Sequence, residues 1–188
     1  MKDDLLRYLQ RGRDSVLWKL DDLTEYDVRR PMVKTGTNLL GLVKHLAGVE
    51  SLYFGAIFDR PMPISVPWVE DDDDEDGVDM WATPDESRDY IIDVYRQVWV
   101  HADATIEALD LDSPGVVPWW SEERKNVNLG IMLTHVIAET HRHAGHADIV
   151  RELIDGEIGY LPATPNLDRD FDWDTYRARL EQAARDAR

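Results

Sequence analysis

Hydrophobic residues recur at helical spacing along four long stretches of the chain. In each stretch apolar side chains stand three or four positions apart, with charged or polar residues between them, as in an amphipathic helix. These stretches cover residues 3–22, 38–58, 83–109 and 126–155. No segment alternates apolar and polar residues as a strand does, and the sequence shows no internal repeat. The pattern predicts an all-α protein, a four-helix bundle of antiparallel helices with long connecting loops.

Cap residues mark the expected ends of these helices. Thr37 precedes the second helix, and Thr83 begins a capping box at the third. Either Asn126 or Asn128 is the expected N-cap of the fourth helix, and Gly156 is its expected stop.

The chain becomes largely polar after the fourth helix. Residues 172–188 are compatible with a helix but lack a strong apolar face, which predicts a loosely attached terminal helix. We therefore expect a helical domain over residues 1–160 and a C-terminal extension over residues 161–188.

The middle connections, residues 59–82 and 110–126, are longer than a simple bundle requires. Loops of this length are often functional, so we expect them to form the mouth of a pocket. The acidic run EDDDDEDG, residues 70–77, predicts a solvated loop, and it lacks the regular spacing of a calcium loop. Four tryptophans in these connections either wall a binding site or pack the ends of the helices: Trp68, Trp81, Trp119 and Trp120.

The fourth helix carries ionisable residues inside its apolar face. Glu139 and His143 are four residues apart, so they lie one turn apart on the arc that also holds Met132, Val136 and Val150. A carboxylate in an apolar stripe is unfavourable unless a partner compensates it. The spacing suits two ligands of one metal ion.

The second helix supplies a third candidate ligand. His45 lies on the same arc as Leu42 and Val49 and so faces the core, whereas Lys44 and Ser51 lie on the opposite side. We hypothesise that His45, Glu139 and His143 hold one metal ion and leave a fourth position for water or substrate. The alternative is three separately satisfied polar groups in the core. The hypothesis requires the imidazoles of His45 and His143 to lie within about 7 Å of each other.

Two imidazoles and one carboxylate suit zinc first, and nickel, iron or manganese nearly as well. His146 borders the same arc and is the candidate catalytic residue, as an acid–base group, a group behind the ligands, or a substitute ligand. His135 is one turn before Glu139 and is a second substitute ligand. The alternative for both is a satisfied histidine at the edge of the core.

The remaining polar residues of these helices receive no role in the metal site. His141 is expected to face solvent, and Arg142 to lie at the rim in a surface salt bridge. His101, on the third helix, is a lone histidine and is expected to be structural or exposed.

Composition narrows the possible partners. The 21 Lys and Arg residues against 38 Asp and Glu residues give a net charge of −17, which argues against nucleic acid and anionic membrane surfaces. The absence of cysteine excludes disulfides and thiolate metal sites, so thiol chemistry needs an external thiol. The N-terminus lacks the apolar region of a signal peptide, and no apolar run is long enough for a membrane span. We expect a cytoplasmic protein.

Two stretches resemble a known family. They resemble the DinB-like superfamily, and the stretches are NLLGLVKHLAGVESLYFG, residues 38–55, and HVIAETHRHAGHADIVRELIDG, residues 135–156. Within the superfamily they are most similar to the actinobacterial branch of mycothiol-dependent enzymes, to which mycothiol-dependent maleylpyruvate isomerase is related. The likeness covers most of residues 1–160. It implies a four-helix bundle with a divalent metal at one end, and homodimers in many members.

The resemblance also implies a ligand set and a cofactor. The superfamily usually supplies one His from the second helix and an HxxxH pair from the last, which correspond here to His45 and His143, with Glu139 in place of the other His of the pair. The mycothiol branch commonly has Glu there. The implied cosubstrate is mycothiol, whose sulfur binds the open metal position.

Three functions remain open from the sequence. The first is a metal-dependent S-transferase in which the metal activates mycothiol for attack on a small electrophile. The second is a metal-dependent hydrolase or isomerase that uses metal-bound water, and the third is a non-catalytic, stress-related bundle that binds metal or ligand.

Overall fold

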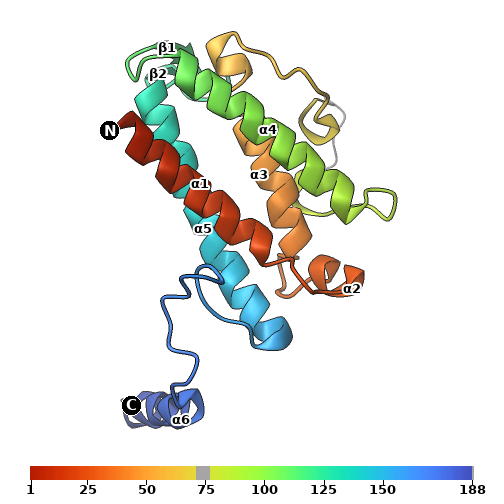
Figure 1. Cartoon of the computed structure of the whole chain (residues 1–188), viewed down its shortest axis with the longest axis vertical. Helices are drawn as coiled ribbons and strands as arrows, with labels where there is room; N and C mark the ends of the chain where they lie inside the picture. Colours follow the sequence, from red (N-terminus) through yellow and green to blue (C-terminus); the bar gives the residue numbers. More distant parts are fainter. Residues whose placement is uncertain (71–76, 188) are drawn as a thin grey trace.

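The computed structural model describes residues 1–70 and 77–187 and is mostly helical (Figure 1). This confirms the predicted all-α class. The predicted acidic loop falls largely outside the described residues. The α-helices are α1 (Lys2–Trp18), α2 (Glu25–Arg29), α3 (Leu39–Tyr53), α4 (Arg88–Ala108), α5 (Leu129–Asp155) and α6 (Trp173–Asp186). Three 3₁₀ turns are η1 (Ala56–Phe58), η2 (Pro67–Val69) and η3 (Val78–Met80).

A small antiparallel hairpin, which the sequence did not predict, joins α4 to α5. Strands β1 (Pro114–Val116) and β2 (Asn126–Asn128) pair through Gly115 and Val127. Three residues are too few to show an alternating pattern, which explains why the prediction missed these strands. The short helix α2 also differs from the prediction, which places no helix between residues 22 and 38.

The limits of α5 follow from its cap residues. The side chain of Asn128 accepts a hydrogen bond from the backbone N–H of Ile131, and Gly156 adopts a left-handed conformation with φ of 79°. Both observations confirm the predicted ends of this helix, because an Asn side chain satisfies a free N–H at the start and Gly tolerates positive φ at the stop.

The predicted starts of α3 and α4 were wrong by one and by four residues. Asn38, not Thr37, caps α3 by accepting from the backbone N–H of Gly41. Ser87, not Thr83, caps α4. The backbone N–H of Thr83 still donates to the Glu86 carboxylate at 2.8 Å, so the predicted box forms a turn ahead of the helix.

Helices α1 and α5 lie side by side and run in the same direction (Figure 1). The backbone carbonyl of Tyr8 accepts from His141, and further along both helices Lys19 pairs with Asp148 at 2.7 Å. The prediction of antiparallel helices is therefore wrong for this pair.

Helices α3 and α4 also run in the same direction, whereas α3 and α5 are antiparallel (Figure 1). Lys44 pairs with Glu86, just ahead of α4, and Glu50 accepts from Tyr95 within it. Two consecutive helices can be parallel only if their connection returns along the whole length of the first. The described parts of residues 54–87, which are residues 54–70 and 77–87, lie along α3, and we call this connection the crossover. This return explains the length noted in the sequence.

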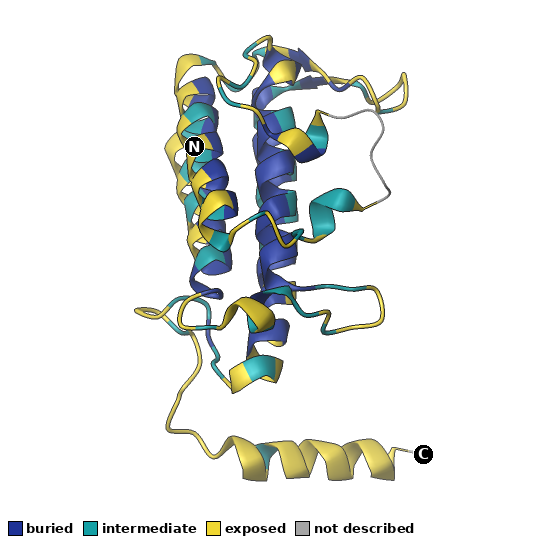
Figure 2. Cartoon of the chain, turned by 90° about the vertical axis from the view of Figure 1, so that its right-hand side faces the viewer, coloured by how far each residue is buried: buried dark blue, intermediate teal, exposed yellow. Residues whose placement is uncertain are grey.

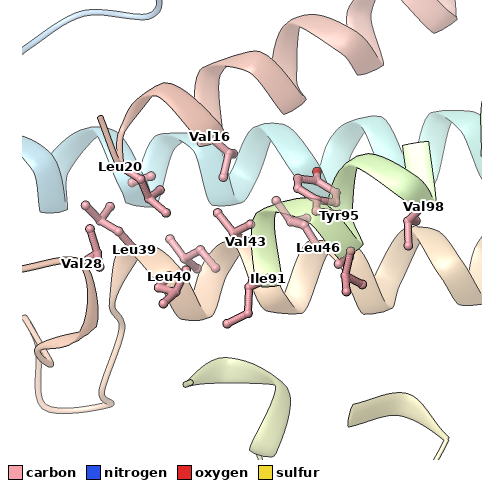
Figure 3. Packing of buried hydrophobic residues seen from close by; sticks show 14 of the residues in the cluster. Val16, Leu20, Val28, Leu39, Leu40, Val43, Leu46, Ile91, Tyr95 and Val98 are labelled. Carbon is pink, nitrogen blue, oxygen red and sulfur yellow. The ribbon is translucent and has the colours of Figure 1, made fainter. Parts of the chain in front are cut away.

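Two clusters of apolar side chains form the core. Figure 3 shows part of the first, where α1, α3 and α4 contribute Val16, Val43, Leu46, Ile91 and Tyr95. The second gathers around Leu9, Phe54 and Met132 toward the hairpin end. Helix α3 is buried on nearly every side (Figure 2), because α4, α5 and the crossover all pack on it. Lys44 and Ser51, opposite the predicted core face, are consequently buried as well.

A buried ion pair links α1 to α3. Arg13 and Glu50 have no solvent-exposed side-chain area, and Arg13 Nη2 lies 2.6 Å from a Glu50 carboxylate oxygen. Tyr95 donates its hydroxyl to the same carboxylate, and Asp103 at the edge of the core accepts from Arg13 Nη1 at 2.8 Å. Burial lowers the pKa of Arg13, but the charge and hydrogen bonds of Glu50 outweigh burial and raise it, so the guanidinium remains charged.

The chain after α5 contacts α1 through residue 160. The backbone carbonyl of Tyr160 accepts from the indole of Trp18 at 2.7 Å and from the hydroxyl of Ser15 at 3.0 Å. Helix α6 beyond it is almost entirely exposed (Figure 2). The division at residue 160 stays a prediction, and these contacts agree with its position.

Candidate metal centre

Helices α3 and α5 bring the three predicted ligands to one place. His45 comes from α3, and Glu139 and His143 come from successive turns of α5. One ligating atom of each lies within 4.8 Å of the others. The ring centroids of His45 and His143 are 4.8 Å apart, inside the limit that the hypothesis required. These distances allow one cation to contact all three side chains.

Both imidazoles point their Nε2 atoms toward one carboxylate oxygen of Glu139. His143 Nε2 lies 2.9 Å and His45 Nε2 lies 3.6 Å from Glu139 Oε1. No arginine pairs with Glu139 among the described residues, in contrast to the core pair of Arg13 and Glu50. The compensation that a half-buried carboxylate needs therefore comes from the two histidines.

Burial and charge set the protonation of this group. Burial lowers the pKa of His143 below its usual value of 6.5, and the neighbouring His45 lowers it further. Burial alone would raise the pKa of Glu139, but hydrogen bonding and charge from His143, with His45, outweigh it and lower the pKa. A neutral imidazole beside an ionised carboxylate is the state that binds a cation.

A residue that the sequence analysis did not single out completes the group. Asp79, in η3 of the crossover, places its Oδ2 2.6 Å from Nδ1 of His45. The hydrogen bond from His45 lowers the pKa of Asp79 in spite of partial burial. An ionised carboxylate can only accept, so His45 donates through Nδ1, and the neutral form of the ring then carries its lone pair on Nε2. No local sequence pattern distinguishes Asp79 from the many other acidic residues of the crossover. Only the three-dimensional path of the chain brings Asp79, and not another of these acids, to His45.

His146 lies behind the ligands and not among them. It is exposed, and its Nδ1 is 3.3 Å from Nδ1 of His143, on the opposite side of that ring from Glu139. His135 packs edge-on against the rings of Tyr53 and Trp120, with centroids 4.9 and 5.2 Å away. Neither histidine joins the group of three among the described residues.

The structure corrects the placement of His141. It does not face solvent freely: its Nε2 donates to the carbonyl of Tyr8 and its ring stacks on Tyr160. The reason is that α1 packs along the side of α5 that the sequence assigned to water. Arg142 is exposed, and His101 is structural, donating to the carbonyl of Arg60 at 2.7 Å.

The four tryptophans separate into different roles. Trp119 and Trp120 contact Tyr53, two turns along α3 from His45, and Trp119 is 52% exposed. Trp68 is buried in the core, so it cannot line a binding wall as one reading of the sequence had it. Trp81 is exposed just after Asp79.

The residues present fit a divalent cation. Two neutral nitrogen donors and one carboxylate oxygen are ligands that zinc and its first-row neighbours accept. A cavity of about 440 Å³ elsewhere, between the end of α5 and α6, is lined by Ile158, Leu167, Trp173 and Tyr176 and shares no residue with this group.

The fold and site define a mostly helical protein with a candidate metal centre between two antiparallel helices. This chain belongs to the mycothiol-S-transferase family, which matches it over residues 4–156. The match confirms the resemblance to the DinB-like, mycothiol-dependent enzymes. The curated proteins include no match to this chain. No helix in the described part of the chain is long and apolar enough to cross a membrane.

Proposed function

We propose that this protein is a metal-dependent mycothiol S-transferase built on a DinB-like four-helix bundle. The observation that carries the proposal is the convergence of His45, Glu139 and His143 within 4.8 Å, in a chain of the mycothiol-S-transferase family. Zinc is the first choice of cation, with nickel, iron and manganese as alternatives. The cosubstrates are mycothiol and a small electrophile.

The chain's own residues prepare the site for a thiol. Three protein ligands leave a coordination position for an exogenous donor. A divalent cation held there would lower the pKa of a bound thiol and so supply thiolate at neutral pH. His45 and His143 would bind the cation through ring nitrogens, and the Glu139 carboxylate offsets one unit of the cation's charge.

The proposed acceptor of the thiol proton is His146 or a metal-bound water. His146 is exposed and lies against the ligand His143, at 3.3 Å between the two Nδ1 atoms. An exposed imidazole next to a ligand can exchange a proton with solvent at neutral pH. Its replacement by Gln should lower turnover and leave the metal in place.

Aromatic side chains are proposed to hold the electrophile. Tyr53 follows His45 by two turns on α3, and His135 precedes Glu139 by one turn on the antiparallel α5. Trp119, Trp120 and His135 all pack on Tyr53. The exposed face of Trp119 offers apolar surface beside Tyr53. This favours an apolar or aromatic electrophile over a charged one.

The test begins with metal content and thiol binding. Elemental analysis of the purified protein should find about one transition metal per chain, and calorimetry should detect mycothiol binding to the metal-loaded form. Transfer of the thiol to a panel of electrophiles should follow. Metal-loaded protein that binds no mycothiol would refute the transferase. Thiol binding without turnover would favour a non-catalytic binding protein, and turnover without thiol would favour a hydrolase or isomerase.

Variants test the ligand set. His45→Ala and Glu139→Ala should each abolish stoichiometric metal binding, because each removes one of three ligands. His141→Ala is the matched control, since His141 is on α5 but contacts α1. Equal loss in all three variants would mean that the assignment of ligands is wrong.

A further inference from the structure

The crossover carries a carboxylate to the outer face of one proposed ligand. Asp79 Oδ2 lies 2.6 Å from His45 Nδ1, while His45 Nε2 points toward Glu139 at 3.6 Å. One ring nitrogen is therefore occupied by the crossover and the other faces the candidate metal centre. In metal sites, a carboxylate in this place orients the imidazole and selects the tautomer that can bind metal.

Helix α3 holds this part of the crossover independently of Asp79. The buried Nζ of Lys44 donates to the carbonyls of Val78 and Trp81, on either side of Asp79, at 2.9 and 3.0 Å. Asn38, the N-cap six residues before Lys44, donates its side-chain amide to the carbonyl of Met80 at 3.1 Å. Three backbone carbonyls of residues 78–81 are thus bound by side chains of α3.

Close approach of the backbone requires a glycine on α3. A Cβ atom at Gly41 would lie 1.9 Å from the carbonyl oxygen of Met80, closer than any real contact. Gly41 stands between Asn38 and Lys44 on the face of α3 that meets the crossover. This face therefore carries the amide of Asn38, the backbone of Gly41 without a side chain, and the ammonium group of Lys44. A larger side chain there must push residues 78–81 away from the helix.

We infer that Asp79 is a positioning residue for His45, and that residues 78–81 are bound to α3 in the register that delivers its carboxylate. The inference rests on the proposed metal centre. The Lys44 and Asn38 contacts hold the segment without the Asp79 carboxylate, so the carboxylate is not needed to anchor the crossover. Its removal should act on the imidazole of His45 and leave the fold intact.

The experiment compares full-length Asp79→Ala and Asp79→Asn with the wild type. The apparent Kd for Zn²⁺ is measured by competition with a chromophoric chelator, and the His45 tautomer of the metal-free protein is read from long-range ¹H–¹⁵N NMR spectra. Asp79→Ala should weaken Zn²⁺ binding by about 10–100-fold and reduce the population with a proton on Nδ1. Asp79→Asn should recover part of both, because its amide oxygen still accepts a hydrogen bond.

Two further variants separate position from charge. Asp85→Ala removes an exposed carboxylate from the same crossover and should change the Kd less than twofold. Gly41→Ala retains Asp79 but displaces its segment, and it should weaken Zn²⁺ binding in the same direction as Asp79→Ala. Far-ultraviolet circular dichroism and thermal unfolding check that each variant is folded.

The outcomes are distinguishable. If folded Asp79→Ala binds Zn²⁺ as the Asp85→Ala control does, or if its His45 tautomer is unchanged, Asp79 has no positioning role and the metal centre stands. If the wild type itself binds no Zn²⁺, the metal centre fails and the role of Asp79 fails with it. Weaker binding together with a changed tautomer supports the inference.

Discussion

Removal of Glu50 is the sharpest test of how α1 and α3 are held together. The Arg13 guanidinium donates three hydrogen bonds to the Glu50 carboxylate, at 3.1, 3.1 and 2.6 Å, and both side chains are fully buried. Among the described residues, Glu50→Leu leaves the buried charge of Arg13 with Asp103, which is partly exposed, as its ionic partner. The ordinary pKa of an arginine guanidinium lies far above neutral pH, so this charge is not relieved by deprotonation.

The expected loss is about 3–4 kcal/mol in the free energy of unfolding. Breaking a buried pair by removing one partner typically costs about 3–5 kcal/mol, and Asp103 offsets part of it. The three bonds cannot simply be summed, because they share one charge. For a chain of this size each kcal/mol lowers Tm by about 2–4 °C, so we expect a decrease of about 6–16 °C.

The assay is urea unfolding followed by far-ultraviolet circular dichroism. Asp103→Asn is the first control and should lose at most about 1 kcal/mol, because Asp103 is partly exposed. The triple variant Arg13→Met, Glu50→Leu, Tyr95→Phe removes the buried ion pair together with the hydroxyl that binds it, and it should recover to within about 2 kcal/mol of the wild type. A loss below about 1 kcal/mol in Glu50→Leu, or a triple variant no better than the single one, would refute the reasoning.

Three further predictions address a cap, the pH response and the tail. Asn128→Ala should destabilise the protein by about 0.5–2 kcal/mol in urea, because α5 loses its N-cap, whereas Asn126→Ala should have little effect. Zn²⁺ affinity should persist as the pH falls to 6.5 and should decline at lower pH. The reason is that burial and His45 lower the pKa of His143, and only a neutral imidazole binds metal. An affinity that is unchanged at pH 5 would contradict this prediction. Deleting residues 161–188 should leave the urea midpoint and metal stoichiometry unchanged, because α6 is almost wholly exposed; a loss of either would show that the tail supports the fold.

Much of the candidate site could be predicted because its signals are local. Glu139 and His143 are four residues apart on one helix, and helix geometry alone places them on one face. His45 stood out because a polar residue on an apolar arc requires an explanation. The cap at Asn128 and the stop at Gly156 follow from backbone chemistry within a few residues.

Other features could not be predicted because they depend on the path of the chain. The sequence indicated helices but not their directions, and the antiparallel prediction failed for α1 with α5 and for α3 with α4 (Figure 1). His141 was assigned to solvent because periodicity describes one helix and not the neighbour that packs beside it. Asp79 had no distinguishing pattern among the acids of the crossover.

The sequence by itself determined the helices, the polar residues on their apolar faces and the spacing of two proposed ligands. These properties depend on interactions between residues one turn apart. Only the tertiary structure decided that α3 and α5 bring His45 to Glu139 and His143, and that the crossover brings Asp79 to His45. Such contacts join residues 34 or more positions apart, and their formation depends on how the whole core packs.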